Sequence, residues 1–132
     1  MVEFVVPGDP VPQPRPRVST RGGFARAYVP STHAVHPYRQ SIALHARAAG
    51  LRQTTEPLEV DIVAVFARPQ SHRTKAGIKS DAPALPRADV DNVAKAVLDA
   101  LREWFDDSSV RRLTIEKFYA DVGYTSVWIV NA

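Results

Sequence analysis

The chain has 132 residues, no cysteine and a formal net charge of +3. This length suits one domain over residues 1–132 with a sizeable core, and the lack of cysteine excludes disulfides and thiolate metal sites. Because the sequence has neither a signal peptide nor an apolar run of spanning length, we expect a cytoplasmic protein with no membrane partner.

The charge is unevenly distributed along the chain. Residues 1–88 contain 12 Lys/Arg against 6 Asp/Glu, whereas residues 89–132 contain 5 against 8. No acid occurs between Asp9 and Glu56, although seven arginines lie there. This asymmetry favours phosphate contacts in the first part and a bound cation in the second. A solvated basic surface is the alternative interpretation.

The N-terminal region predicts a strand followed by a stiff basic segment. Val2 to Val6 is apolar enough for a first strand, and five prolines between Pro7 and Pro16 favour an extended chain. Residues 18–20 and 24–29 flank Arg21-Gly22-Gly23, a pattern typical of a hairpin. The flanking prolines would pre-position Arg15 and Arg17 as phosphate ligands.

The middle of the chain predicts a helix, a strand and a long loop. The helix would run from about His36 or Pro37 to Ala49, with Gly50 as its stop. Alternation over residues 58–66 predicts a strand with one buried face, which explains Glu59 and Asp61 as solvent-facing residues. From residue 67 to 88 the periodicity vanishes and basic residues are frequent. We interpret this loop as a flexible arm over nucleic acid.

An acidic cluster begins the next predicted helix. Apolar residues recur at helical spacing from Val90, and the helix should stop near Trp104-Phe105. Asp89 or its neighbour would be the N-cap, while Asp91 and Lys95 share a face. A neighbouring antiparallel element could return Asp107 toward Asp89 and Asp91. Convergent carboxylates are the ligands that Mg²⁺ prefers.

The same acids have an ordinary structural interpretation. Acidic residues in a first helical turn and an Asp91–Lys95 pair stabilise helices. Asp106-Asp107 would then be a solvated turn. Spacing alone supports both interpretations.

The C-terminal region predicts two strands over residues 110–120 and 124–130. The short connection Asp121-Val122-Gly123 favours an antiparallel hairpin. Helices and strands that interleave without a βαβ repeat indicate an α+β fold, a small mixed sheet with two helices packed on one face.

Two blocks of this sequence resemble a known family. Asp89, Asp91, Asn92 and Lys95, followed by Asp99-Ala100-Leu101 and Trp104-Phe105-Asp106-Asp107, are similar to the signature of the RusA family of Holliday junction resolvases. The opening Gly8-Asp9-Pro10-Val11-Pro12-Gln13-Pro14-Arg15-Pro16-Arg17 resembles that family's proline-rich start.

The resemblance implies a small homodimeric α/β sheet protein with defined site residues. It makes Asp89, Asp91 and Asp107 metal ligands, Lys95 an essential positive group, Asn92 and Asp106 supporting residues, and Arg15 and Arg17 DNA contacts. From the pattern of charge we add further candidate DNA contacts, which are Arg21, Arg73, Lys75 and Arg87.

The leading hypothesis is therefore a Mg²⁺-dependent endodeoxyribonuclease, with Mn²⁺ as a substitute, that resolves four-way junctions by paired nicks in DNA recombination and repair. One alternative is a non-catalytic basic module that binds branched or single-stranded nucleic acid. Another is a metal-dependent nuclease that acts on flaps or forks. Nothing in the sequence separates junction from flap substrates.

Overall fold

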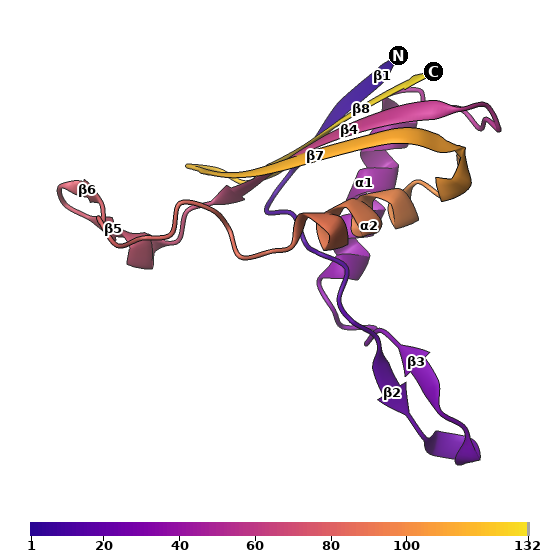
Figure 1. Cartoon of the computed structure of the whole chain (residues 1–132), viewed down its shortest axis with the longest axis horizontal. Coiled ribbons are helices and arrows are strands. Elements are labelled where there is room, and N and C mark those ends of the chain that lie inside the picture. Colours follow the sequence, from indigo (N-terminus) through magenta and orange to yellow (C-terminus); the bar gives the residue numbers. More distant parts are fainter. Residues whose placement is uncertain (132) are drawn as a thin grey trace.

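A computed structural model describes residues 1–131. A four-stranded sheet in the order β1-β8-β4-β7 forms its centre, and helices α1 and α2 both lie on one face of this sheet (Figure 1). The predicted α+β class is confirmed. The elements are β1 (Val2–Pro7), β2 (Arg17–Ser19), β3 (Arg26–Tyr28), α1 (Val35–Ala48), β4 (Leu58–Ala67), β5 (Arg73–Thr74), β6 (Gly77–Ile78), α2 (Val90–Ala100), β7 (Val110–Ala120) and β8 (Tyr124–Asn131).

The core lies between the sheet and the two helices. Strand β4 alternates as its sequence predicts, with Leu58, Val60 and Ile62 at most 2% exposed and facing the helices. The helices contribute residues such as Ile42 and Val97, both fully buried. Burial of each such side chain stabilises the fold by about 1.5–3 kcal/mol relative to leaving it exposed.

The predicted hairpin of the last two strands is wrong. Strands β7 and β8 follow each other in sequence, but β4 lies between them, parallel to β7 and antiparallel to β8. The connection therefore passes the end of β4, where the Arg68 N–H donates to the Ala120 carbonyl at 2.9 Å. The central position suits β4 because its backbone and its buried face then gain neighbours on both sides.

The end of the central helix also differs from its prediction. Helix α2 ends at Ala100 instead of near Trp104-Phe105, and turns follow over residues 101–104. Leu101, Trp104 and Phe105 are nevertheless buried in the core, at no more than 7% exposure. Their helical spacing reflects burial from a turn, which a periodic pattern does not distinguish from a continuing helix.

Two small antiparallel ribbons extend from this body (Figure 1). The first is β2–β3, which confirms the hairpin predicted around Arg21-Gly22-Gly23. The second is β5–β6, within the segment that was expected to be a loop over residues 67–88. Neither helix in residues 1–131 has the length and hydrophobicity needed to cross a membrane.

Candidate metal and nucleic-acid site

Asp89 occupies the N-cap position of α2, as its spacing predicts. Its backbone is extended (φ −73°, ψ 130°), but its carboxylate accepts no capping hydrogen bond from the helix. The preceding loop is held by Lys117 of β7, whose Nζ donates to the carbonyls of Pro86 at 2.8 Å and Ala88 at 3.0 Å. The backbone at Asp89 is therefore fixed by neighbours, and its exposed carboxylate is not occupied by helix capping.

Three of the candidate residues line one pocket between α2 and β7. Asp91, Lys95 and Asp107 border this pocket of about 320 Å³, which we call the α2–β7 groove. Lys95 Nζ lies 3.9 Å from the Asp99 carboxylate, so the expected Asp91–Lys95 pair is not formed. The remaining lining is apolar and consists of Val90, Ala94, Leu98, Leu113 and Ile115.

The two adjacent acids after α2 have different surroundings. Asp106 caps the short 3₁₀ turn Asp107–Ser109, because its Oδ1 accepts from the Ser108 N–H at 3.1 Å. Asp107 Oδ2 accepts from Arg102 at 3.3 Å, whereas Asp107 Oδ1 is buried and has no partner in residues 1–131. A buried carboxylate oxygen without a donor is costly. A cation in the groove would relieve that cost.

Within residues 1–131, no three His, Asp or Glu side chains lie close enough to hold one metal ion. The expected convergence of Asp89, Asp91 and Asp107 in one chain is therefore not observed. Asp89 precedes an eleven-residue helix and Asp107 follows it, and at 1.5 Å per residue the helix alone spans about 16 Å. Asp107 begins the 3₁₀ turn that precedes the returning strand β7, and so remains at the far end of α2.

The two acids of the groove, Asp91 and Asp107, nevertheless suit a hydrated divalent cation. Mg²⁺ commonly binds through one or two carboxylates and retains several waters, so a closed cage of protein ligands is not required. The unpartnered oxygen of Asp107 and the uncapped carboxylate of Asp89 are available as hard oxygen ligands. Asn92 lies in the first turn of α2, three residues after Asp89, and is half-buried.

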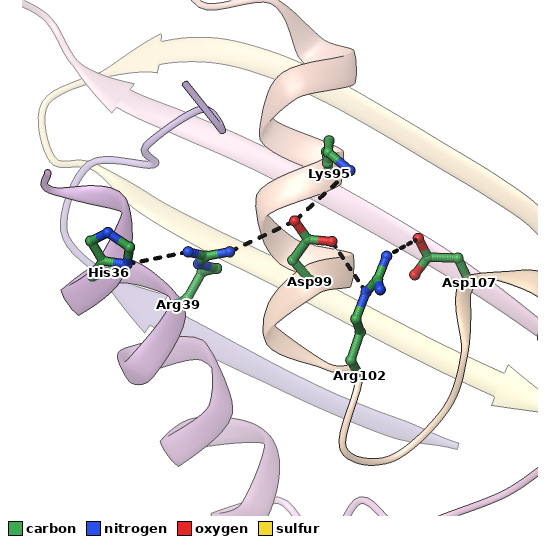
Figure 2. A network of polar contacts seen from close by, with 6 residues as sticks. All are labelled: His36, Arg39, Lys95, Asp99, Arg102 and Asp107. Carbon is green, nitrogen blue, oxygen red and sulfur yellow. Dashed lines mark hydrogen bonds and ion pairs between the residues drawn. The ribbon is translucent and has the colours of Figure 1, made fainter. Parts of the chain in front are cut away.

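Asp99 organises the charged side chains beside the groove, and the sequence interpretation assigned it no role (Figure 2). Its carboxylate is only 15% exposed and lies 3.7 Å from Arg39, 3.9 Å from Lys95 and 3.3 Å from Arg102. The network continues from Arg39 to His36, whose Nδ1 lies 3.2 Å from the Arg39 guanidinium. The sequence does contain a signal for this role, because Asp99 lies four residues after Lys95 and three residues before Arg102, spacings at which helical side chains can pair.

The proline-rich segment is joined to the first turn of α2. The Gln13 N–H donates to the Asn92 carbonyl at 2.8 Å, and the Gln13 side-chain oxygen is buried without a partner in residues 1–131. Arg15 follows two residues later and is exposed. The predicted phosphate-binding segment therefore begins directly beside the predicted metal ligands.

The other candidate DNA contacts are spread over the arms and the loop before α2. Arg17 and Arg21 are exposed on the β2–β3 ribbon, Lys75 is exposed at the turn of β5–β6, and Arg87 is exposed next to Asp89. Arg73 instead pairs with Asp121 at 3.0 Å and is 33% exposed. Arg73 thus helps to fasten the β5–β6 ribbon to the body.

Two histidines and the two acids of β4 have structural partners. His33 accepts from the Val35 N–H at 3.0 Å, and His45 hydrogen-bonds to the Ser41 carbonyl at 2.7 Å. Glu59 pairs with Arg111 on the uncovered face of the sheet. A hydrogen bond from Thr114, reinforced by Arg112, lowers the pKa of Asp61.

The structure thus combines a mixed sheet with two helices on one face, a groove bordered by Asp91, Lys95 and Asp107, and two basic ribbons. Residues 7–130 match the family described as Endodeoxyribonuclease RusA, and the chain belongs to this family. It is also 32% identical over 136 residues to a protein of Bacillus subtilis (strain 168) named "Uncharacterized protein YqaN", with 97% of this chain and 94% of YqaN covered. The protein is therefore an endodeoxyribonuclease.

Proposed function

We propose that this endodeoxyribonuclease resolves Holliday junctions by paired symmetric nicks that depend on Mg²⁺, with Mn²⁺ as a substitute, in DNA recombination and repair. Asp107 carries this proposal, because its Oδ1 is buried without a partner in residues 1–131 and the residue borders the same groove as Asp91 and Lys95. The RusA family provides the substrate class, which is branched DNA.

Asp89, Asp91 and Asp107 are the proposed metal-binding carboxylates. When bound, the ion supplies Lewis acidity at the phosphoryl oxygen and lowers the pKa of a coordinated water. Lys95 neutralises charge that develops at the scissile phosphate. Asp99 holds the ammonium of Lys95 at the edge of the groove through their 3.9 Å contact. Asn92 and Asp106 support the site, the latter through its cap on the turn that carries Asp107.

A homodimer is the proposed working assembly, and it would complete the site that one chain leaves open. The α2–β7 groove is lined by Asp91 from the first turn of α2, by Lys95 from its middle and by Asp107, which follows the helix. A two-fold axis through the middle of this groove would place Asp107 of one chain near Asp89 and Asp91 of the second. Each of the two resulting sites would then combine acids from both chains, and a two-fold enzyme presents one site to each of two opposing strands of a junction.

Basic residues at the start of the chain and before α2 are the proposed DNA contacts. Arg15, Arg17, Arg21, Lys75 and Arg87 are exposed, and no ion pair in residues 1–131 engages them. Arg73 is a weaker candidate than the sequence alone suggested, since it pairs with Asp121. These residues would recognise the shape and charge of the branch with little direct base readout.

Cleavage of a synthetic four-way junction tests the proposal. The wild-type protein and Asp91→Asn are compared in Mg²⁺, Mn²⁺ and EDTA, with linear duplex and flap substrates as controls. We expect symmetric paired nicks only for the wild type, only with metal and preferentially on the junction. If Asp91→Asn cuts as well as the wild type, Asp91 is not part of the site. If the wild type cuts the flap in preference to the junction, the flap is the substrate.

A further inference from the structure

The β2–β3 ribbon presents a basic and aromatic face that has no assigned ligand. The strands pair Arg17 with Tyr28 and Ser19 with Arg26, so these four residues share one face of the ribbon. Gly22 and Gly23 form the turn with φ of +78° and +81°, a region that glycine adopts without strain. Figure 1 shows the ribbon extending away from the sheet and from both helices.

This face is hollowed. Ser19, Arg21, Arg26 and Tyr28 line a depression of about 610 Å³, within the range of small-molecule sites. The depression contains two guanidinium groups, the Ser19 hydroxyl and the phenol ring of Tyr28, a residue that is 45% exposed. In residues 1–131 neither arginine has an acidic partner. The two guanidinium groups are therefore not neutralised by the chain itself, whereas Ser19 Oγ accepts from the Arg21 N–H at 3.3 Å.

We propose that this depression binds one unpaired nucleotide at the branch point of the DNA. Arg21 and Arg26 would bind its phosphate, and the Tyr28 ring would stack on its base. Phe24, which follows the turn and is 70% exposed, would contact the neighbouring base pair. This inference rests on the proposed function, which supplies branched DNA as the substrate.

An unpaired nucleotide suits this face better than an intact duplex does. Inside a duplex both faces of each base are covered by stacking, so a tyrosine ring has no free base to contact. At a branch point stacking is interrupted, and side chains that insert there use the exposed bases. Stacking on an aromatic ring tolerates any base, which agrees with recognition of shape instead of sequence.

A polyanion is also favoured over a second copy of the chain as the occupant. The ribbon lies in the stretch between Asp9 and Glu56 that has seven arginines and no acid. Two such ribbons in contact would place like charges together, which costs free energy. DNA phosphates neutralise the same charges and release counterions.

The test uses Tyr28→Leu and, as a matched control, Phe118→Leu on β7, because both aromatic rings are 45% exposed. Affinity is measured in Ca²⁺ for two four-way junctions, one intact and one with abasic sites at the branch nucleotides. We expect Tyr28→Leu to weaken binding to the intact junction about tenfold, the effect of losing one base–aromatic stack. Tyr28→Leu should bind the abasic junction as tightly as the wild type does, with the same slope of affinity against salt. Phe118→Leu should bind both junctions as the wild type does.

Equal affinity of Tyr28→Leu and wild type for the intact junction would overturn the inference. So would a change of Tyr28→Leu from dimer to monomer in sedimentation without DNA, because the ribbon would then be a contact between chains. Wild-type cleavage in Mg²⁺ is scored separately. Wild type that binds but does not cut would contradict the proposed nuclease site, while the affinity comparison would still decide the role of Tyr28.

Discussion

The phenol oxygen of Tyr38 in α1 lies 2.6 Å from the hydroxyl oxygen of Thr125 in β8, and this hydrogen bond is fully enclosed by the core. It joins the first helix to the sheet between residues 87 positions apart in the chain. Burial raises the pKa of Tyr38 to about 12, although the bond to Thr125 acts in the opposite direction.

This hydrogen bond predicts an alkaline limit to stability. The Tyr38 pKa is higher in the folded protein than in the unfolded chain, where it is about 10, so the folded state retains the proton more strongly. The contribution of protonated Tyr38 to the free energy of unfolding is complete below about pH 10. It is lost as pH rises toward 12, and the free energy of unfolding then falls by up to about 1.4 kcal/mol per pH unit. Tyr38→Phe should lack this part of the slope in urea unfolding measured from pH 8 to 11. At pH 7 it should be less stable by about 1–3 kcal/mol, since Thr125 loses its partner.

Substitutions at Asp107 and at Asp106 should distinguish the effect of metal binding from the effect of helix capping. Asp107→Asn should reduce junction cleavage at least a hundredfold because it removes the unpartnered carboxylate. Its melting temperature should stay near that of the wild type, since the exposed pair with Arg102 contributes less than about 1 kcal/mol. Asp106→Asn is the matched control, because asparagine also accepts the capping hydrogen bond. Equal loss of cleavage in both variants would contradict the distinct roles of the two acids.

Mixed dimers should reveal whether the site is shared between chains. Asp91→Asn and Asp107→Asn are each inactive in the proposed site, and refolding them together forms dimers that contain one chain of each kind. If Asp107 of one chain works with Asp91 of the second, each mixed dimer has one intact site. Such dimers should make single nicks in a junction within a supercoiled plasmid. If both acids of a site come from the same chain, mixing will restore no cleavage.

Lys117 should control the position of Asp89 without touching DNA. Lys117→Met keeps the length of the side chain but removes both hydrogen bonds to the loop before Asp89. We expect a loss of stability of about 1–3 kcal/mol and a higher Mg²⁺ concentration for half-maximal cleavage. Junction affinity in Ca²⁺ should be retained. Glu116→Gln, an exposed neighbour on β7, is the control, and an unchanged Mg²⁺ requirement in Lys117→Met would show that Lys117 supports only the fold.

Arg15 should contribute to binding through charge. Arg15→Ala should weaken junction binding and reduce the slope of log affinity against log salt by about one. Arg52→Ala, which removes an exposed arginine beyond α1, is the control and should leave this slope unchanged. Identical salt dependence of Arg15→Ala and wild type would exclude a phosphate contact at Arg15.

Several parts of this fold were predictable from the sequence because their causes are local. Alternation defined β4, helical spacing defined the start of α2 at Asp89, and the glycines defined the β2–β3 ribbon. Each depends on side chains only a few positions apart. The candidate acids were recognised for the same reason, since their residue types and spacing are written in the chain.

Only the tertiary structure decided which of these local elements meet. It inserted β4 between β7 and β8, because burial of a central strand outweighs the short connection that favours a hairpin. It kept Asp107 apart from Asp89 by the length of α2, left one of its oxygens buried without a partner, and made Asp99 the partner of Lys95. Residue types and spacing thus determined the chemistry that the chain carries. Long-range packing, which no local pattern encodes, determined that the three acids do not meet within one chain.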